Sequence, residues 1–181
     1  MSEAIFISYR RGDAAGHAAW LKRYLVDYFD TDQIFFDVGS IESSADFRAR
    51  IEPALTHARV VLVVIGPDWL DEIRKRAFKA PLDWVRREIA LSLARRQEPD
   101  GPLVVPLLVG GVDAPDEATL PWDVKGLAAL QMHRLDNEPQ YESDFQRLLT
   151  RLTGLPGVPQ PRFRVRDARS LDVAMGRGQQ E

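Results

Sequence analysis

The chain has 181 residues, a net charge of −3 and no cysteine, which is enough length for one domain with a hydrophobic core. The negative net charge argues against the basic surface that nucleic acid requires. The lack of cysteine excludes disulfides, a thiol nucleophile and a zinc–thiolate site. The apolar runs are too short to span a membrane and the N-terminus lacks signal-peptide features, so we expect a cytoplasmic protein without membrane contact.

The first half of the chain alternates short apolar runs with helical patterns. Apolar residues spaced by three and four predict a helix over 14–29. A further helix is expected after Ser43, which with Asp46 resembles a capping box, and Pro53 should kink or restart it. Short, continuous apolar runs suit strands that are buried on both faces of a parallel sheet. Such strands are expected at residues 4–9, 33–38 and 59–65.

The second half continues the alternation. A charged loop is expected over 71–79, and a segment without Gly or Pro then predicts a helix over 83–96. Residues 112–128 contain three helix-breaking positions and should be mostly loop. The remaining elements are strands at 103–109 and 130–135 and an amphipathic helix that starts near Tyr141 and includes Leu152.

Alternating strands and helices predict an α/β fold with a central parallel sheet. Five strands in this style suggest a flavodoxin-like, three-layer arrangement with the strand order 2-1-3-4-5. We assign residues 1–154 to this domain. Residues 155–181 contain prolines and five arginines among few apolar residues, so we expect a flexible or loosely docked tail there.

Glu88 falls on the apolar side of the predicted helix over 83–96. On a helical wheel it lies roughly 40° from Trp84, between Trp84 and Val85. A carboxylate on a buried face costs free energy unless it is paired or functional, and such groups cluster at active sites. The wheel leaves a second reading open, in which Glu88 caps the edge of the apolar stripe and pairs with an arginine or faces water.

Candidate ligand-binding side chains follow the predicted strands, because open α/β sheets bind ligands at the carboxyl ends of their strands. Arg10 and Arg11 suit an anion, since guanidinium groups bind phosphate oxygens as a fork, although a solvated loop or a partner carboxylate explains them equally well. Tyr9 and Trp69 either stack on a ligand ring or belong to the core. Asp37 either caps its loop or holds a ribose hydroxyl.

Several classes of protein lack support in the sequence. No G-x-G-x-x-G motif follows the first strand and no Walker A motif is present, which argues against a Rossmann dehydrogenase and a P-loop protein. A receiver domain would have acidic residues where this chain has Arg10 and Arg11. The histidines His17, His57 and His133 are scattered without metal-ligand spacing, so no metal site is expected.

Three motifs resemble those of TIR (Toll/interleukin-1 receptor) domains. The run 6–11, FISYRR, resembles the first motif of that family. The run 35–38, FFDV, followed by Ile41, is similar to the second motif and the start of the loop called BB. Trp84 and Glu88 match the W-x-x-x-E pattern of NAD-cleaving TIR domains. The third motif looks especially like the enzymes that drive axon degeneration and like many bacterial TIR proteins.

The resemblance covers about residues 4–152 and implies a hydrolase that breaks the nicotinamide–ribose bond of NAD⁺. It implies that Glu88 is the catalytic residue and faces the ribose, and that Trp84 walls the site. NAD⁺ would be the substrate, with no separate cofactor. The candidate substrate-binding residues are Tyr9, Arg10, Arg11, Asp37 and Trp84.

The resemblance also implies how such an enzyme is regulated. Sites of this kind are commonly completed by a neighbouring TIR domain, so activity would require a homo-oligomer held by TIR–TIR contacts. The product would be ADP-ribose or a cyclic form of it. A role in bacterial defence, with a separate sensor or effector protein, would fit a stand-alone TIR domain. The alternative is a non-catalytic TIR adaptor that acts only through TIR–TIR contacts.

Overall fold

The computed structural model describes residues 4–36, 45–76, 83–135 and 139–162. Five parallel strands form one sheet in the order β2-β1-β3-β4-β5, which confirms the predicted fold class. The strands are β1 (Ile5–Ser8), β2 (Ile34–Phe35), β3 (Val60–Ile65), β4 (Leu103–Val109) and β5 (His133–Leu135).

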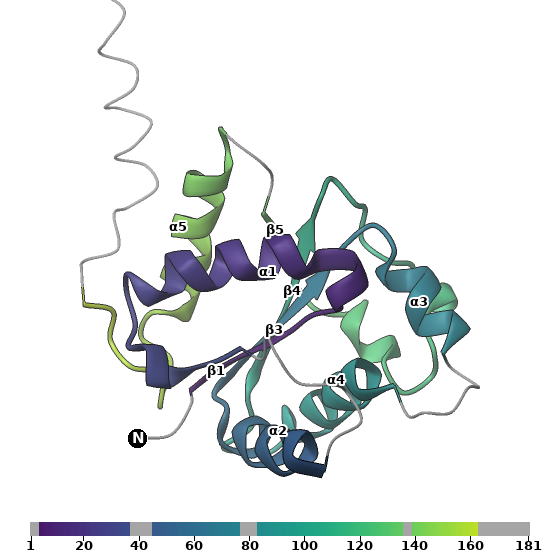
Figure 1. Ribbon diagram of the computed structural model, residues 1–181, viewed down its shortest axis with the longest axis horizontal. Coiled ribbons are helices and arrows are strands. Elements are labelled where there is room, and N and C mark those ends of the chain that lie inside the picture. The colour runs from purple at the N-terminus through teal and green to yellow at the C-terminus, as the bar shows by residue number, and fades with distance from the viewer. Residues whose placement is uncertain (1–3, 37–44, 77–82, 136–138, 163–181) are drawn as a thin grey trace, which may run out of the picture.

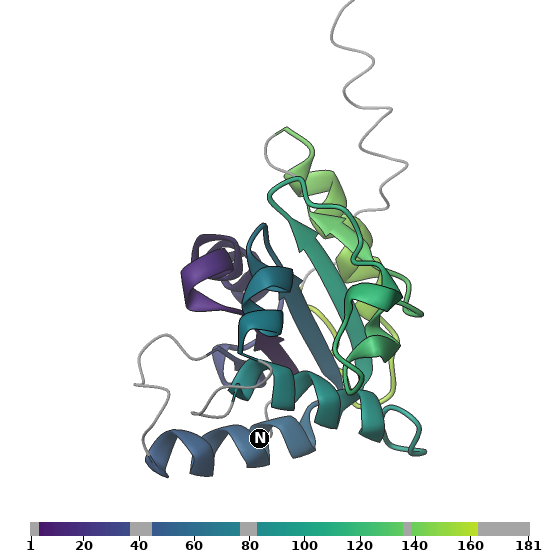
Figure 2. The same cartoon turned by 90° about the vertical axis from the view of Figure 1, so that its right-hand side faces the viewer.

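Helices cover both faces of the sheet. Figure 1 shows α1 and α5 above it and α2 and α4 below it, and Figure 2, turned by 90°, shows the strands side by side. The α-helices are α1 (Arg11–Val26), α2 (Ala45–His57), α3 (Trp69–Lys75), α4 (Trp84–Arg95) and α5 (Tyr141–Leu152). Short 3₁₀ turns occupy η1 (Thr31–Gln33), η2 (Glu117–Thr119) and η3 (Lys125–Leu127).

The sequence of the central strand β3 is apolar without interruption because both faces of the strand are buried. Val60, Leu62 and Val64 belong to the core cluster shared with α1 and α5. Val61 and Val63, which point the other way, belong to the cluster shared with α2, α3 and α4. Every residue of β3 is buried, and each such side chain contributes about 1.5–3 kcal/mol by leaving water.

One element differs from the sequence prediction. The charged loop predicted over 71–79 is wrong for its first part, because α3 occupies Trp69–Lys75. Trp69 and Ile73 lie one helical turn apart and are fully buried, so two apolar anchors hold a short helix whose charged residues face outward. The other predicted elements are present, and α2 continues through Pro53 instead of restarting there.

The segment after α5 packs against the body of the domain as far as residue 162. Val158 is buried in the cluster of α1 and α5, and the backbone N–H of Arg162 donates to the carbonyl of Tyr28 over 2.8 Å. Arg162 also pairs with Asp30. Residues 163–181 lie outside the described residues, so the expected tail stays a prediction. In the part of the chain that is described, no helix is long and apolar enough to cross a membrane.

Candidate functional site

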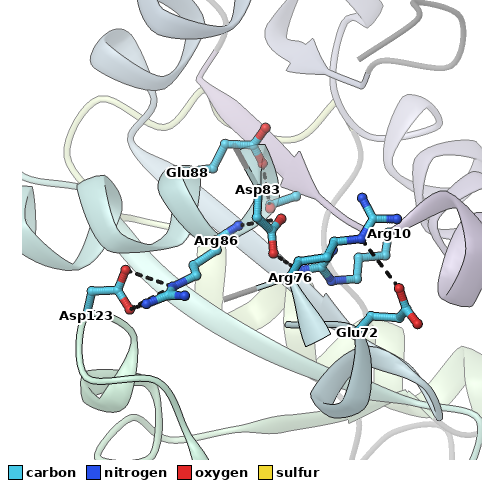
Figure 3. Close-up of polar contacts among 8 residues, drawn as sticks. Arg10, Glu72, Arg76, Asp83, Arg86, Glu88 and Asp123 are labelled. Carbon is cyan, nitrogen blue, oxygen red and sulfur yellow. Dashed lines mark hydrogen bonds and ion pairs between the residues drawn. The ribbon is translucent and has the colours of Figure 1, made fainter. Parts of the chain in front are cut away.

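The carboxyl end of β1 and the first turns of α4 form the candidate site. Ser8, the last residue of β1, donates a hydrogen bond from Oγ to Oε2 of Glu88 over 2.7 Å. Ser8 is 1% exposed and Glu88 is 6% exposed. The wheel-based expectation that Glu88 lies on the buried face is therefore met, and its carboxylate points at a strand end (Figure 3).

The start of α4 fixes the orientation of Glu88. Asp83 caps the helix by accepting a hydrogen bond from the backbone N–H of Arg86 over 3.3 Å. Ile89, next to Glu88, is fully buried and anchors the same face in the core. Ser92 Oγ donates to the backbone carbonyl of Glu88 over 2.7 Å. The Asp83 cap and the buried Ile89 therefore leave the helix little freedom to rotate Glu88 away from β1.

A buried ion pair joins the same two elements beside Glu88. Arg10 Nη2 donates to Oδ2 of Asp83, and both side chains are almost completely buried (Figure 3). Two charges removed from water are stable only when they are well paired, so this contact ties the end of β1 to the start of α4. Among the described residues, the Nε–H of Arg10 has no hydrogen-bond partner although it is buried.

The arginines that follow Trp84 pair with other carboxylates. Arg86 contacts Asp123 with an Nη2–Oδ1 distance of 2.8 Å. Nη2 of Arg87 lies 3.3 Å from Oε1 of Glu52, and the guanidinium of Arg87 lies 5.3 Å from the ring centre of Trp84.

The remaining aromatic and basic candidates lie around these contacts. Tyr9 is half-buried and stacks on Phe36 with ring centres 5.0 Å apart. Trp84 is half-buried in the first turn of α4, whereas Arg11 is exposed at the start of α1. Trp69 is a core residue with no exposed surface, in line with the plainer of its two readings. Asp37 lies outside the described residues.

Asp13 has a structural role that the sequence did not reveal. It lies in the first turn of α1, which begins at Arg11. Its carboxylate accepts hydrogen bonds from the backbone N–H groups of Gly66 (3.1 Å) and Asp68 (2.8 Å) in the loop after β3. Burial raises the pKa of Asp13, and these two bonds oppose that effect. Asp13 thereby holds a second strand end in place.

Ser8 and Asp83 are the residues of the candidate site that the sequence did not single out. The one signal for Ser8 is a hydroxyl at the end of an otherwise apolar strand. The signal for Asp83 is its position directly before the helix, which is typical of a capping residue.

The model of the TIR-domain family matches residues 5–149. The chain belongs to the TIR-domain family. The match covers the sheet, the five α-helices up to Leu149 in α5, and all the described site residues. The family assignment in the sequence analysis is therefore confirmed.

A solved TIR structure shares this fold. The TIR domains of the activated Roq1 resistosome, which directly recognises the pathogen effector XopQ, match with a TM-score of 0.61 and 14% identity, over 83% of this chain and 99% of that chain. A metazoan TIR-STING receptor from C. gigas matches with a TM-score of 0.47 and 18% identity, over 96% of this chain and 45% of that one. A comparison with curated proteins finds no relative. At 14% identity, the likeness to the Roq1 TIR domains concerns the fold alone.

Proposed function

We propose that this TIR domain cleaves NAD⁺ between nicotinamide and ribose, with Glu88 as the catalytic carboxylate. The observation that carries the proposal is the buried position of Glu88, hydrogen-bonded to Ser8 at the carboxyl end of β1. A carboxylate removed from water in this way costs free energy, and that cost is expected where the charge does chemical work.

The chemistry suits a single carboxylate. The nicotinamide ring of NAD⁺ is cationic while it is bonded to ribose. It therefore leaves as a neutral molecule and needs no general acid. The ribose develops oxocarbenium character as the bond breaks, and a fixed carboxylate in a water-poor site stabilises that charge. The hydroxyl of Ser8 holds Oε2 of Glu88, which limits rotation of the carboxylate and keeps it preorganised. A water or an adenine nitrogen then attacks the sugar, which gives ADP-ribose or a cyclic product.

The residues around Glu88 would hold the substrate. Trp84, one turn before Glu88 on α4, would wall the site. Tyr9 and Arg11 would contact the nicotinamide end and the phosphates. The buried Nε–H of Arg10, which lacks an acceptor among the described residues, would donate to an oxygen of NAD⁺ while the other side of its guanidinium stays paired with Asp83. Asp37, outside the described residues, would hold a ribose hydroxyl.

Activity would depend on assembly. We propose that contacts between copies of this TIR domain complete the site, that a separate sensor or effector protein triggers them, and that the activity serves bacterial defence in the cytoplasm. The support for these proposals is the resemblance of the three motifs to those of NAD-cleaving TIR domains.

The proposal is tested by adding NAD⁺ to concentrated or crowded protein and measuring nicotinamide by chromatography. Wild type should release nicotinamide, and Glu88→Ala and Glu88→Gln should not, while both variants retain the wild-type circular dichroism spectrum. Equal NAD⁺ consumption by wild type and both variants would show that another site or a contaminant is responsible.

The second candidate function is a non-catalytic adaptor. The exposed indole of Trp122, with 82% of its surface accessible, favours it, because large exposed aromatic residues often mark protein contacts. In that case Trp122→Ala would weaken self-association in analytical ultracentrifugation, and neither wild type nor Glu88→Gln would release nicotinamide.

A further inference from the structure

A cavity of about 440 Å³ lies at the edge of the sheet opposite to Glu88. It is walled by the amino-terminal ends of β3 and β4, the loop after α4, the end of α5 and the segment that follows α5. Its volume is within the range of small-molecule sites. Neither Glu88, Trp84 nor Tyr9 lines it, so it is separate from the candidate active site.

The walls of this cavity carry positive charge. Arg59, Arg96 and Arg151 line it, and Asp100 is the one carboxylate among the lining residues. This local excess is opposite in sign to the net charge of −3 of the whole chain. Guanidinium groups bind phosphate oxygens as a fork, so three arginines around one cavity of this size point to an anionic ligand.

Two of these arginines are held at the wall by backbone carbonyls. Arg59 Nη1 donates to the carbonyl of Asp100 over 2.9 Å, and Arg151 Nη1 donates to the carbonyl of Gln131 over 2.9 Å. Each bond uses one of the five N–H donors of a guanidinium. The side chain of Arg96 is exposed and forms no hydrogen bond or ion pair within the part of the chain that is described.

A purely structural explanation accounts for part of this arrangement. Arg96 and Arg151 lie near the C-terminal ends of α4 and α5, where positive charge stabilises the helix dipole. Arg59 also follows the C-terminal end of α2 by two residues, and its Nη1 lies 3.6 Å from Oδ1 of Asp100. Burial also lowers the pKa of Arg151, which means that its charge is poorly solvated where it lies. A bound anion would compensate that charge.

Apart from the arginines, Asp100, Gly101 and Gln131, the residues that line the cavity are apolar. A phosphate ion would reach the arginines but would leave this wall uncovered, whereas an organic phosphate would cover both parts. The apolar lining residues are Pro99, Pro102, Leu103, Val104, Ala129, Leu130, Leu155 and Pro156.

We propose that this cavity binds a small organic phosphate, with its phosphate on Arg59, Arg96 and Arg151 and its apolar or aromatic part on Leu103, Leu130 and Leu155. The ligand would bridge α4, β4 and the segment after α5, three elements that meet at this edge. The inference does not depend on NAD⁺ cleavage by Glu88.

The test is an NMR titration of the ¹⁵N-labelled full chain with AMP, beside adenosine and inorganic phosphate. AMP should shift the amides of Gly101, Gln131 and Leu155, and it should bind more tightly than either adenosine or phosphate. Because Arg96 is exposed, Arg96→Gln should fold normally and weaken AMP binding by roughly five- to tenfold. Arg59→Gln should weaken it further, and Arg23→Gln, an exposed arginine of α1, should leave it unchanged.

Three results would overturn the proposal. The first is the absence of amide shifts around the cavity at millimolar AMP. The second is equal affinity of wild type, Arg96→Gln and Arg59→Gln. The third is binding of adenosine or inorganic phosphate as tight as that of AMP, because one part of the cavity would then contribute nothing. Glu88→Gln should bind AMP here as wild type does, so this test and the test of NAD⁺ cleavage can fail independently.

Discussion

The hydrogen bond between Ser8 and Glu88 joins side chains 80 positions apart in the sequence. The Arg10–Asp83 pair next to it joins positions 73 apart. The helical pattern around Trp84 placed Glu88 on the apolar side of its helix, but it left open whether the side chain is buried or faces water. Its partners could not be predicted, because they depend on where β1 ends relative to α4, and no local pattern encodes that distance.

Ser8→Ala should separate positioning from folding. It removes the hydroxyl that holds Oε2 of Glu88, so we expect a loss of stability of about 1–3 kcal/mol. If NAD⁺ is cleaved, nicotinamide release should fall roughly ten- to hundredfold, because a misplaced catalytic group loses much of its effect. Initial rates and urea unfolding measure the two effects.

The matched control for this change is Ser92→Ala. Ser92 is another fully buried serine, and it bonds to the backbone carbonyl of Glu88 instead of the carboxylate. Ser92→Ala should lower stability but leave the rate of nicotinamide release by the folded protein nearly unchanged. Equal rate losses in the two variants would mean that Ser8 acts only through folding.

The Arg10–Asp83 pair should be important for stability. Asp83→Ala leaves the guanidinium of Arg10 buried without its carboxylate and removes the cap of α4, so we expect a loss of about 3–5 kcal/mol. Glu52→Ala, which breaks the exposed contact with Arg87, should cost less than about 1 kcal/mol. Urea denaturation measures the free energy of unfolding of both variants. Similarly small losses of stability in the two would show that the buried pair is dispensable.

Among the elements, the strongest sequence signals predicted the structure best. The strand β4 occupies the predicted residues 103–109, and α5 starts at Tyr141 and ends at Leu152. The short helix α3 was missed because its seven residues include only two fully buried anchors, Trp69 and Ile73. A charged segment of this length has too little periodicity to distinguish a helix from a loop.

The loop between β3 and α3 depends on a glycine. A Cβ atom at Gly66 would lie 2.6 Å from Oδ1 of Asp13, so Gly66→Ala must displace the carboxylate that holds this loop. We expect a destabilisation of about 1–3 kcal/mol. Gly16→Ala in α1, where no atom lies within 4 Å of the added Cβ, should instead stabilise by up to about 1 kcal/mol. Thermal unfolding distinguishes them, and a neutral Gly66→Ala would refute the close approach.

His133 makes the contact between β5 and α5 sensitive to pH. Its Nε2 lies 2.8 Å from the carbonyl of Asp144, and burial lowers its pKa because the charged imidazolium is poorly solvated. The unfolded chain therefore binds a proton first as pH falls below about 6.5, and this group's contribution to stability is lost as pH falls through the folded-state pKa.

The comparison with His133→Gln isolates this effect, because the other titrating groups are common to both proteins. Between pH 7.5 and 5.5, the free energy of unfolding of wild type should fall more than that of the variant. Parallel pH profiles from urea unfolding would contradict the assignment.

At the scale of the whole molecule, the fold places chemically different groups at the two edges of one sheet. Glu88, Ser8 and the Arg10–Asp83 pair gather at the carboxyl end of β1. The arginine-lined cavity lies at the amino ends of β3 and β4. The sequence predicted the first edge from the strand–helix alternation and the TIR motifs. It could not predict the second, because Arg59, Arg96 and Arg151 are distant in sequence and belong to no motif.

The most direct test of the central claim is the initial rate of nicotinamide release from NAD⁺ by the full chain, followed by ¹H NMR at increasing protein concentration. If Glu88 is the catalytic group and assembly completes the site, the rate per chain should rise with concentration. The folded Glu88→Gln variant at the highest concentration should then stay at background. A Glu88→Gln variant as active as wild type would contradict the account.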